Sequence, residues 1–229
     1  MNAVTSQKKF FSSIIDTLAF VVLLSVTFST TAFAGELPIG RFTAEGLAGW
    51  EEKSFKGNTK YRLVKEGDRM VVEANSRGTA SGMFKELRFD PEQYRWLRWS
   101  WKIDKTLTEG DERTKAGDDY AARVYVVFPG TFFWQTKAIN YIWANTLSQG
   151  EAIANAYTSS AMMVAVQSGD ENSGRWLTEE RDIYSDYEEL FGSPPGAAGA
   201  VAIMTDTDDT GGSATAWYGD ITLSSQPQP

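Results

Sequence analysis

Short segments that alternate between apolar and polar residues follow one another along this chain. In the clearest example every second residue is apolar: Leu97, Trp99, Trp101 and Ile103. The residues between them are polar: Arg98, Ser100, Lys102 and Asp104. Alternation with a period of two is typical of a β-strand with one buried face, so we expect the apolar set to lie in the core.

Ten segments of strand length are expected, separated by turn residues such as Gly, Asn and Asp. They cover residues 50–55, 59–65, 69–75, 82–89, 97–104, 120–128, 139–144, 161–167, 200–205 and 214–222. One helix is expected over residues 181–191, because apolar residues recur there at helical spacing and Gly192 marks its end. The sequence therefore predicts an all-β fold, an antiparallel jelly-roll β-sandwich with one short helix in a long connection.

The chain begins with the pattern of a removable export signal over residues 1–34. Lys8 and Lys9 precede an apolar run, and Ala32-Phe33-Ala34 provides the small residues that signal peptidases prefer. The run is shorter than the roughly 18 to 20 residues that span a bilayer, so we expect cleavage near Ala34 and no retained anchor. The mature protein is then expected in the periplasm or outside the cell.

The mature chain is expected to form a single β-sandwich domain over residues 35–223 and to end in a disordered tail over residues 224–229. Cleavage removes Lys8, Lys9 and Asp16 from 22 basic and 30 acidic side chains, which leaves 20 and 29 and a net charge of −9. Such an acidic domain is repelled by nucleic acid and by anionic lipid surfaces. The composition therefore argues against nucleic-acid binding.

Two reactive residue types are missing from the chain, which has no cysteine and no histidine. Their absence excludes Ser-His and Cys-His catalysis and nearly every zinc or copper site, because these depend on imidazole or thiolate groups. Any bound metal is expected to be a hard cation on oxygen ligands. Any general acid or base is expected to be Asp, Glu, Tyr or Lys.

A polar group lies at the start of the strand expected over residues 120–128: Asp118, Asp119, Arg123 and Tyr125. An arginine in such an apolar strand needs a partner, because it keeps its charge when buried. In one interpretation the two aspartates pair with Arg123, Arg98 or Lys102 in a structural network. In the other, the basic side chains and Tyr125 project from adjacent strands into a concave surface that binds a sugar or an acid. Both hold if the network rigidifies a site.

Eight tryptophans in an exported β-protein favour a carbohydrate ligand, because indole faces pack against sugar rings while Asn, Asp and Arg bind hydroxyl groups. Trp134, Trp143 and Trp176 lie in irregular segments near Asn140 or Arg175 and are the candidate platforms, with burial in the core as the alternative for each. The candidate ligand-binding residues are Arg98, Lys102, Asp118, Asp119, Arg123, Tyr125, Asn140 and Trp143.

The segment over residues 205–212 is the most metal-like part of the chain, with carboxylates at Asp206, Asp208 and Asp209 and threonines between them. Calcium takes about six to eight oxygen ligands, so these three aspartates are the candidate calcium ligands. The spacing is not that of an EF-hand loop. The alternative is a turn whose Asp side chains cap their own backbone.

Four motifs, in order along the chain, resemble those of a known family. They lie at residues 99–104, 118–125, 140–144 and 203–211, and the last is followed by residues 218–221. They resemble the bacterial domain of unknown function family 3047, and the resemblance covers nearly the whole mature chain. Members are typically exported and resemble the jelly-roll sandwiches of carbohydrate-binding modules, so the resemblance implies that fold and compartment. It implies no activity, and Asp209 stands where it would place an asparagine.

These observations lead to one main hypothesis and two alternatives. The main hypothesis is an exported, non-catalytic jelly-roll domain that binds a glycan or another envelope component, with calcium as a structural ion. The first alternative is a carbohydrate-active hydrolase or lyase using Asp, Glu or Tyr, since glycosidases need two carboxyl groups about 5 to 9 Å apart. The second is an envelope structural or interaction protein, which requires a large exposed apolar patch.

Overall fold

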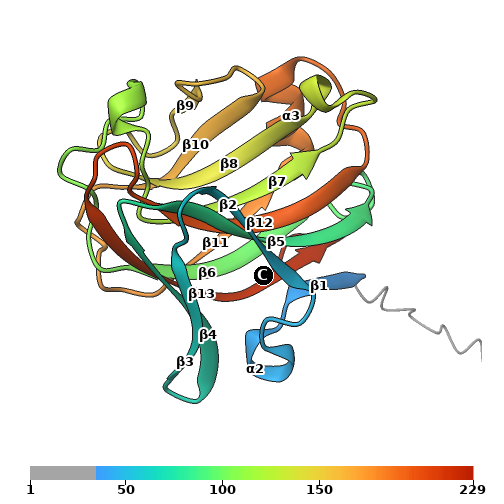
Figure 1. The fold of residues 1–229 in the computed structure, drawn as a ribbon. Helices are drawn as coiled ribbons and strands as arrows, with labels where there is room; N and C mark the ends of the chain where they lie inside the picture. The colour runs from blue at the N-terminus through green and yellow to red at the C-terminus, as the bar shows by residue number, and fades with distance from the viewer. Residues whose placement is uncertain (1–34, 229) are drawn as a thin grey trace, which may run out of the picture. The chain divides into compact units, whose positions relative to one another are not determined.

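A computed structural model describes residues 35–228, apart from the side chain of residue 133, and places them in two packed β-sheets (Figure 1). The predicted signal peptide over residues 1–34 lies outside the described residues. Among residues 35–228, no helix has the length and hydropathy of a membrane-spanning segment.

The first sheet has six strands, and every pair in it is antiparallel. Its order is β11 (Leu177–Asp182), β6 (Trp96–Ile103), β13 (Ser213–Ser224), β4 (Arg69–Arg77) and β3 (Lys60–Glu66), and β1 (Glu36–Gly40) pairs with β13. Strand β13 thus lies at the centre of this sheet.

The second sheet has seven strands and contains one parallel pair, β8 with β10. Its order is β2 (Trp50–Lys56), β5 (Ala80–Phe89), β12 (Ala198–Asp206), β7 (Arg123–Phe128), β8 (Lys137–Ala144), β10 (Ala161–Ser168) and β9 (Ala152–Ala154). The other pairs are antiparallel. The predicted all-β sandwich is confirmed, and the parallel pair is the one departure from antiparallel pairing.

The predicted helix is present as α3 (Ile183–Phe191). Asp182 caps its first turn by accepting the Ser185 N–H, and Gly192 ends it with a φ of 69°, in the left-handed region that favours glycine. Five short elements were not predicted: the helix α2 (Phe42–Glu45), the 3-10 turns Lys115–Gly117 and Phe133–Gln135, and the strands β1 and β9. Strand β11 was also not predicted, because its sequence is largely polar.

The described part of the C-terminal tail makes specific contacts. Ser224 is the last residue of β13. Gln228 donates from its backbone N–H to Glu180 on β11 and from its side chain to Glu36 on β1. Residues 224–228 therefore follow the six-stranded sheet, where the sequence predicts a disordered tail.

Aromatic rings fill the space between the two sheets. The alternation predicted for β6 is confirmed, since Leu97, Trp99, Trp101 and Ile103 are all buried. Trp99 of β6 stacks on Tyr141 of β8 with ring centres 5.3 Å apart. The ring centres of Trp101 of β6 and Trp143 of β8 are 5.7 Å apart. Burial of these large rings stabilises the packing of the two sheets through the hydrophobic effect.

One tyrosine of the core links the six-stranded sheet to the strands that carry the candidate site. Tyr218, on β13, donates its hydroxyl proton to the Met204 carbonyl at 2.6 Å and accepts the Arg123 backbone N–H at 3.3 Å. Its side chain is fully buried. The hydroxyl therefore satisfies two backbone groups beneath the side chains of Arg123 and Met204.

We predict that Tyr218→Phe destabilises the fold by about 1 to 3 kcal/mol, because the Met204 carbonyl, the Arg123 N–H and the Thr205 hydroxyl each lose a buried hydrogen bond. Tyr187→Phe is the matched control: Tyr187 is also buried, and its hydroxyl makes no hydrogen bond to another described residue. Urea unfolding of the three proteins measures the difference. Equal stabilities would show that the Tyr218 hydroxyl does not anchor these strands.

Candidate functional site

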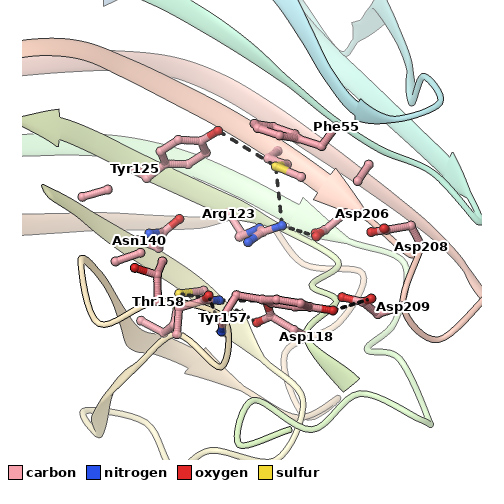
Figure 2. A pocket seen from close by; sticks show the side chains of 16 residues that line it. Phe55, Asp118, Arg123, Tyr125, Asn140, Tyr157, Thr158, Asp206, Asp208 and Asp209 are labelled. Carbon is pink, nitrogen blue, oxygen red and sulfur yellow. Dashed lines mark hydrogen bonds and ion pairs between the residues drawn. The ribbon is translucent and has the colours of Figure 1, made fainter. Parts of the chain in front are cut away.

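The outer face of the seven-stranded sheet, turned away from the core, carries a cavity of about 600 Å³ (Figure 2). The strands contribute ten of its lining residues: Phe55, Ala80, Arg123, Tyr125, Ala138, Asn140, Ala161, Met163, Met204 and Asp206. The connecting loops contribute six more: Asp118, Asn155, Tyr157, Thr158, Asp208 and Asp209. We call this cavity the groove.

The groove lies over a sheet face with small side chains at several positions. Ala80, Ala138 and Ala161 come from β5, β8 and β10, and a larger side chain at any of these positions would fill part of the hollow. On β7 the alternation predicted from the sequence holds, since Val124 and Val126 belong to the core while Arg123 and Tyr125 face the groove. The hollow thus follows from residue size and strand parity.

A buried ion pair forms the central polar feature of the groove. The Arg123 guanidinium donates to the Asp206 carboxylate from the neighbouring strand β12, and lies 4.8 Å from the centre of the Tyr120 ring. The other oxygen of Asp206 accepts the Tyr120 N–H at 3.2 Å. Arg123 therefore has the carboxylate partner that its burial requires, but this partner is Asp206 and not Asp118 or Asp119, the two that the sequence suggested.

Burial sets the protonation of this pair. Burial raises the pKa of Asp206 to about 8, and the nearby carboxylates of Asp119 and Asp118 add to this rise against the attraction of Arg123. Burial alone would lower the pKa of Arg123, but Asp206 and Asp118 hold it above its ordinary value.

Asp118 is held by neutral donors. Asn155 donates to both of its carboxylate oxygens, at 2.9 and 2.7 Å, and the Tyr120 hydroxyl donates to one of them at 2.9 Å. Burial raises the pKa of this carboxyl group. The two side chains that donate hydrogen bonds to Asp118, those of Asn155 and Tyr120, are both neutral.

Asn140 stands out because its side chain is buried but has no hydrogen-bond partner among the described residues. Its exposed fraction is 6%, and what remains accessible lines the groove. It pairs with Tyr125 of β7 on one side and with Met163 of β10 on the other. An amide in this position can donate to and accept from a ligand in the groove.

Two exposed aromatic rings border the groove. Tyr157 is 54% exposed and donates its hydroxyl proton to Asp209 at 2.8 Å, a bond that raises the pKa of Tyr157 to about 12. Phe55, on the edge strand β2, is 65% exposed. In Figure 2 the Tyr157 ring lies across the groove from Phe55, with Arg123 between them.

Most of the predicted site residues meet at the groove, but four of the predicted ligand-binding residues do not: Arg98, Lys102, Asp119 and Trp143. Arg98 and Lys102 lie on β6, in the other sheet: Arg98 donates to Gln228, and Lys102 pairs with Glu66 and lies over the Trp217 ring. The prediction that they share a surface with Arg123 is wrong, because β6 and β7 follow each other in sequence but belong to different sheets.

None of the three tryptophans predicted as candidate platforms lines the groove. Trp143 is fully buried between the sheets and donates its indole N–H to the Gly169 carbonyl at 3.0 Å. Trp176 lies on the side of the six-stranded sheet, where it donates to Glu66. Trp134 lies in the β7–β8 connection, where its ring stacks on Phe132, and it does not line the groove.

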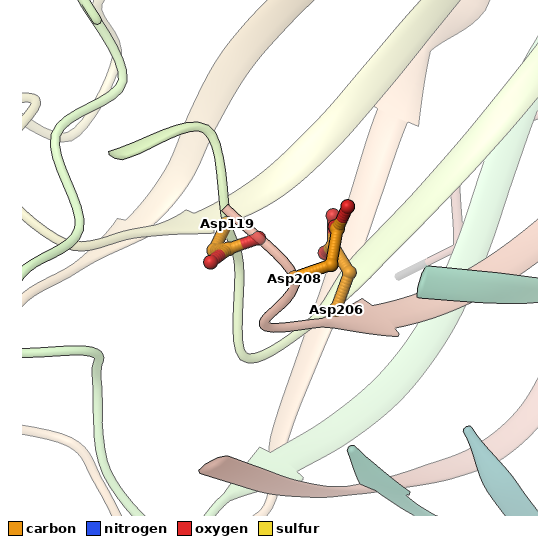
Figure 3. Close-up of side chains that lie close together, drawn as sticks. All are labelled: Asp119, Asp206 and Asp208. Atoms are coloured by element: carbon orange, nitrogen blue, oxygen red, sulfur yellow. The ribbon is translucent and has the colours of Figure 1, made fainter. Parts of the chain in front are cut away.

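The candidate metal ligands are arranged differently from the expected set. Oxygens of Asp119, Asp206 and Asp208 lie within 4.8 Å of one another (Figure 3), whereas Asp209 turns to Tyr157. Asp119 accepts the N–H groups of Asp209 and Thr210, at 3.2 and 2.6 Å, so it caps the loop. It does not line the groove, which corrects its prediction as a ligand-binding residue.

This donor set fits calcium only in part. Carboxylate oxygens are suitable ligands, but those of Asp119 and Asp206 already accept hydrogen bonds from the backbone and from Arg123. Asp208 pairs with Lys56 at 3.6 Å. Burial, together with Asp209 and Asp119, raises the pKa of Asp208. Arg123 and Lys56 therefore supply positive charge where the sequence suggests a metal.

Sequence reasoning missed the contribution of the loop between β9 and β10. Asn155, Tyr157 and Thr158 come from it, and Phe55 and Met163 come from strands in which nothing marks them as surface residues. An amide and an aromatic residue close together just before a strand are a weak signal for a site. The pairing that brings this loop beside residues 118–125 cannot be read from the local pattern.

The fold and the site together define a β-sandwich protein with an open groove on the outer face of one sheet. The family described as Protein of unknown function (DUF3047) matches residues 48–222. The chain belongs to this family, which confirms the resemblance seen in its motifs. The comparison with curated proteins gave no match.

Similar solved structures include a family 30 carbohydrate-binding module of a Clostridium thermocellum cellulosomal cellulase, at 11% identity and a TM-score of 0.49, covering 85% of this chain and 99% of the module. A family 11 carbohydrate-binding module from the same organism has 12% identity, a TM-score of 0.45, and coverage of 83% and 94%. A Bauhinia forficata lectin in complex with GalNAc has 12% identity, a TM-score of 0.42, and coverage of 83% and 98%.

We predict that titration of Asp206 makes the protein less stable as pH rises. With a folded pKa of about 8 and an unfolded pKa of about 3.9, Asp206 stabilises the fold fully below the unfolded value and loses this contribution as pH rises through the folded value. Urea unfolding in the presence of a chelator, from about pH 5 to pH 8, should show wild type losing stability relative to Asp206→Asn. The reverse trend would mean that Arg123 keeps Asp206 ionised.

We predict that calcium does not raise the melting temperature by more than about 1 °C over a chelator control, because internal donors already occupy Asp119 and Asp206. Thermal unfolding of wild type and Asp208→Asn at several calcium concentrations is the measurement. A rise of several degrees in wild type, lost in Asp208→Asn, would show that the cluster binds calcium.

Proposed function

We propose that this protein is an exported, non-catalytic glycan-binding protein whose ligand lies in the groove. The observation that carries the proposal is the buried Asn140 amide, which has no partner among the described residues and faces the cavity. The polar atoms of this amide are accessible from the groove, so a ligand there can donate a hydrogen bond to its oxygen and accept one from its nitrogen. A sugar hydroxyl does both.

The rest of the lining supports the same ligand class. The rings of Tyr157 and Phe55 offer apolar faces to the C–H groups of a sugar, while Asp118 and Asp209 offer acceptors for its hydroxyl groups. The volume, about 600 Å³, lies in the range of small-molecule sites. Export, which the first 34 residues support, would expose the groove to envelope or extracellular glycans.

One observation favours a hydrolase as the second candidate. Oxygens of Asp206 and Asp208 lie within 4.8 Å of each other, near the spacing of about 5 Å found in retaining glycosidases, and both residues line the groove. Against this, Asp206 is 2% exposed and its two oxygens are bound by Tyr120 and Arg123. A carboxylate held in this way cannot readily approach a glycosidic bond, so we favour binding.

Calorimetric titration with soluble polysaccharides tests the proposal. We expect Asn140→Ala and Tyr157→Ala each to weaken binding by about tenfold or more, which corresponds to about 1.4 kcal/mol. Asn140→Ala should leave stability unchanged, because no described residue loses a hydrogen-bond partner. Phe132→Ala is the matched control, since Phe132 is 52% exposed and lies outside the groove.

Two results would contradict the proposal. Binding that is unaffected by both groove variants would place the ligand elsewhere. Release of reducing ends from a bound polysaccharide, abolished in Asp208→Asn at unchanged melting temperature, would make the protein a hydrolase.

A further inference from the structure

The groove crosses the strands. In sheet order its lining residues come from β2, β5, β12, β7, β8 and β10. Cross-strand register connects them: Ala80 pairs with Asp206, Met204 with Arg123, and Tyr125 with Asn140. Neighbouring strands are about 4.8 Å apart, so six strands give a path of roughly 24 Å. This is several times the width of a single sugar ring.

The lining residues are spread across the sheet and do not cluster at one point. They come from six of its seven strands and from the connecting loops. Such a spread suits an extended chain better than a compact or branched group. Phe55 borders the groove at the edge strand β2, and Thr158 comes from the connection to β10 near the opposite side of the sheet.

The charge of the lining is negative. Four carboxyl groups line the groove, those of Asp118, Asp206, Asp208 and Asp209. Arg123 is the one cation among the lining residues and is paired with Asp206, so the negative charge comes from the other three. Lys56 pairs with Asp208 from outside the lining. Asp118 is bound by neutral groups and Asp209 by the Tyr157 hydroxyl. A carboxylate or sulfate on a ligand would therefore meet like charges in a partly desolvated site.

We propose, on the basis of the proposed function, that the groove binds an internal stretch of a linear, uncharged glycan lying across the strands, and that its carboxylates exclude acidic glycans. The Asn140 amide and the acceptors of Asp118 and Asp209 bind hydroxyl groups of successive sugar units. Affinity then grows with chain length until the path across the sheet is filled.

The test measures how the length and the charge of an oligosaccharide change its affinity for the full-length mature protein. Calorimetric titration uses neutral gluco-, manno- and galacto-oligosaccharides of one to about six residues, and oligogalacturonate and alginate oligomers of matched length. We expect tenfold or greater gains in affinity from short to long neutral chains and no measurable binding of the acidic oligomers at low salt. Salt should weaken the exclusion, because it screens the carboxylates.

Variants of the lining aspartates test whether the groove carboxylates are what excludes acidic glycans. The single variant Asp209→Asn and the double variant Asp208→Asn/Asp209→Asn remove charge from partly exposed positions. In both, the affinity for acidic oligomers should come within about tenfold of the affinity for neutral ones. Glu171→Gln removes an equal charge from an exposed residue outside the groove and should change nothing. Melting temperatures confirm that each variant is folded.

The outcomes separate the two proposals. If no oligosaccharide or polysaccharide binds, the proposed function fails. If glycans bind through Asn140 but a monosaccharide binds as tightly as a long chain, or acidic oligomers bind as tightly as neutral ones, the function stands and this inference is wrong. Length-dependent binding of neutral chains, with acidic chains admitted only by the aspartate variants, supports it.

Discussion

The buried pair of Arg123 and Asp206 is the interaction on which the outer face of the seven-stranded sheet depends. It joins the neighbouring strands β7 and β12 at the point where both enter loops. A buried guanidinium without its carboxylate would cost several kcal/mol, so the two residues must be kept together. The Tyr120 N–H and the Tyr218 hydroxyl fix the backbone around them. The acidic loop, which carries Asp208 and Asp209, and the groove lining are arranged around this pair.

The architecture was predictable because the strands are short and strongly patterned. Alternation identified the buried face of β6 and both faces of β7, and the capping residues of α3 were visible in the sequence. The strands that were missed are short or polar. Strand β9 has three residues, and β11, at the edge of its sheet, consists mostly of charged residues that pair with β6 on one side alone.

The site could be predicted only in part. Arg123 and Tyr125 were identified from strand parity, and Asp118 and Asn140 were identified as polar residues beside the apolar strands. Parity says which face a side chain takes but not to which sheet a strand belongs, so Arg98 and Lys102 were assigned to the wrong surface. Parity does place Trp143 with Ile139 and Tyr141 on the core face, where it packs against Trp101, so its assignment to a binding surface was wrong. The contribution of Tyr157 depends on a loop closing over a distant strand, which is a tertiary effect.

The acidic loop shows how two interpretations of one sequence pattern can be separated by geometry. Asp206 and Asp208 lie close to Asp119, as a metal site would require, yet Arg123, Lys56 and backbone N–H groups already oppose their charge. The same carboxylates leave the groove negative, and this property connects the loop to the choice of ligand. Under the proposed function, the structural network and the ligand-binding surface share residues, and the network rigidifies the site.

Amide chemical-shift mapping during titration with a neutral oligosaccharide shows whether ligands enter the groove of the seven-stranded sheet. We expect the largest shifts on Arg123, Tyr125, Asn140, Tyr157 and their neighbours. Shifts centred on Lys102, Trp176 and Trp217 of the other sheet, or spread evenly over both sheets, would contradict binding in the groove.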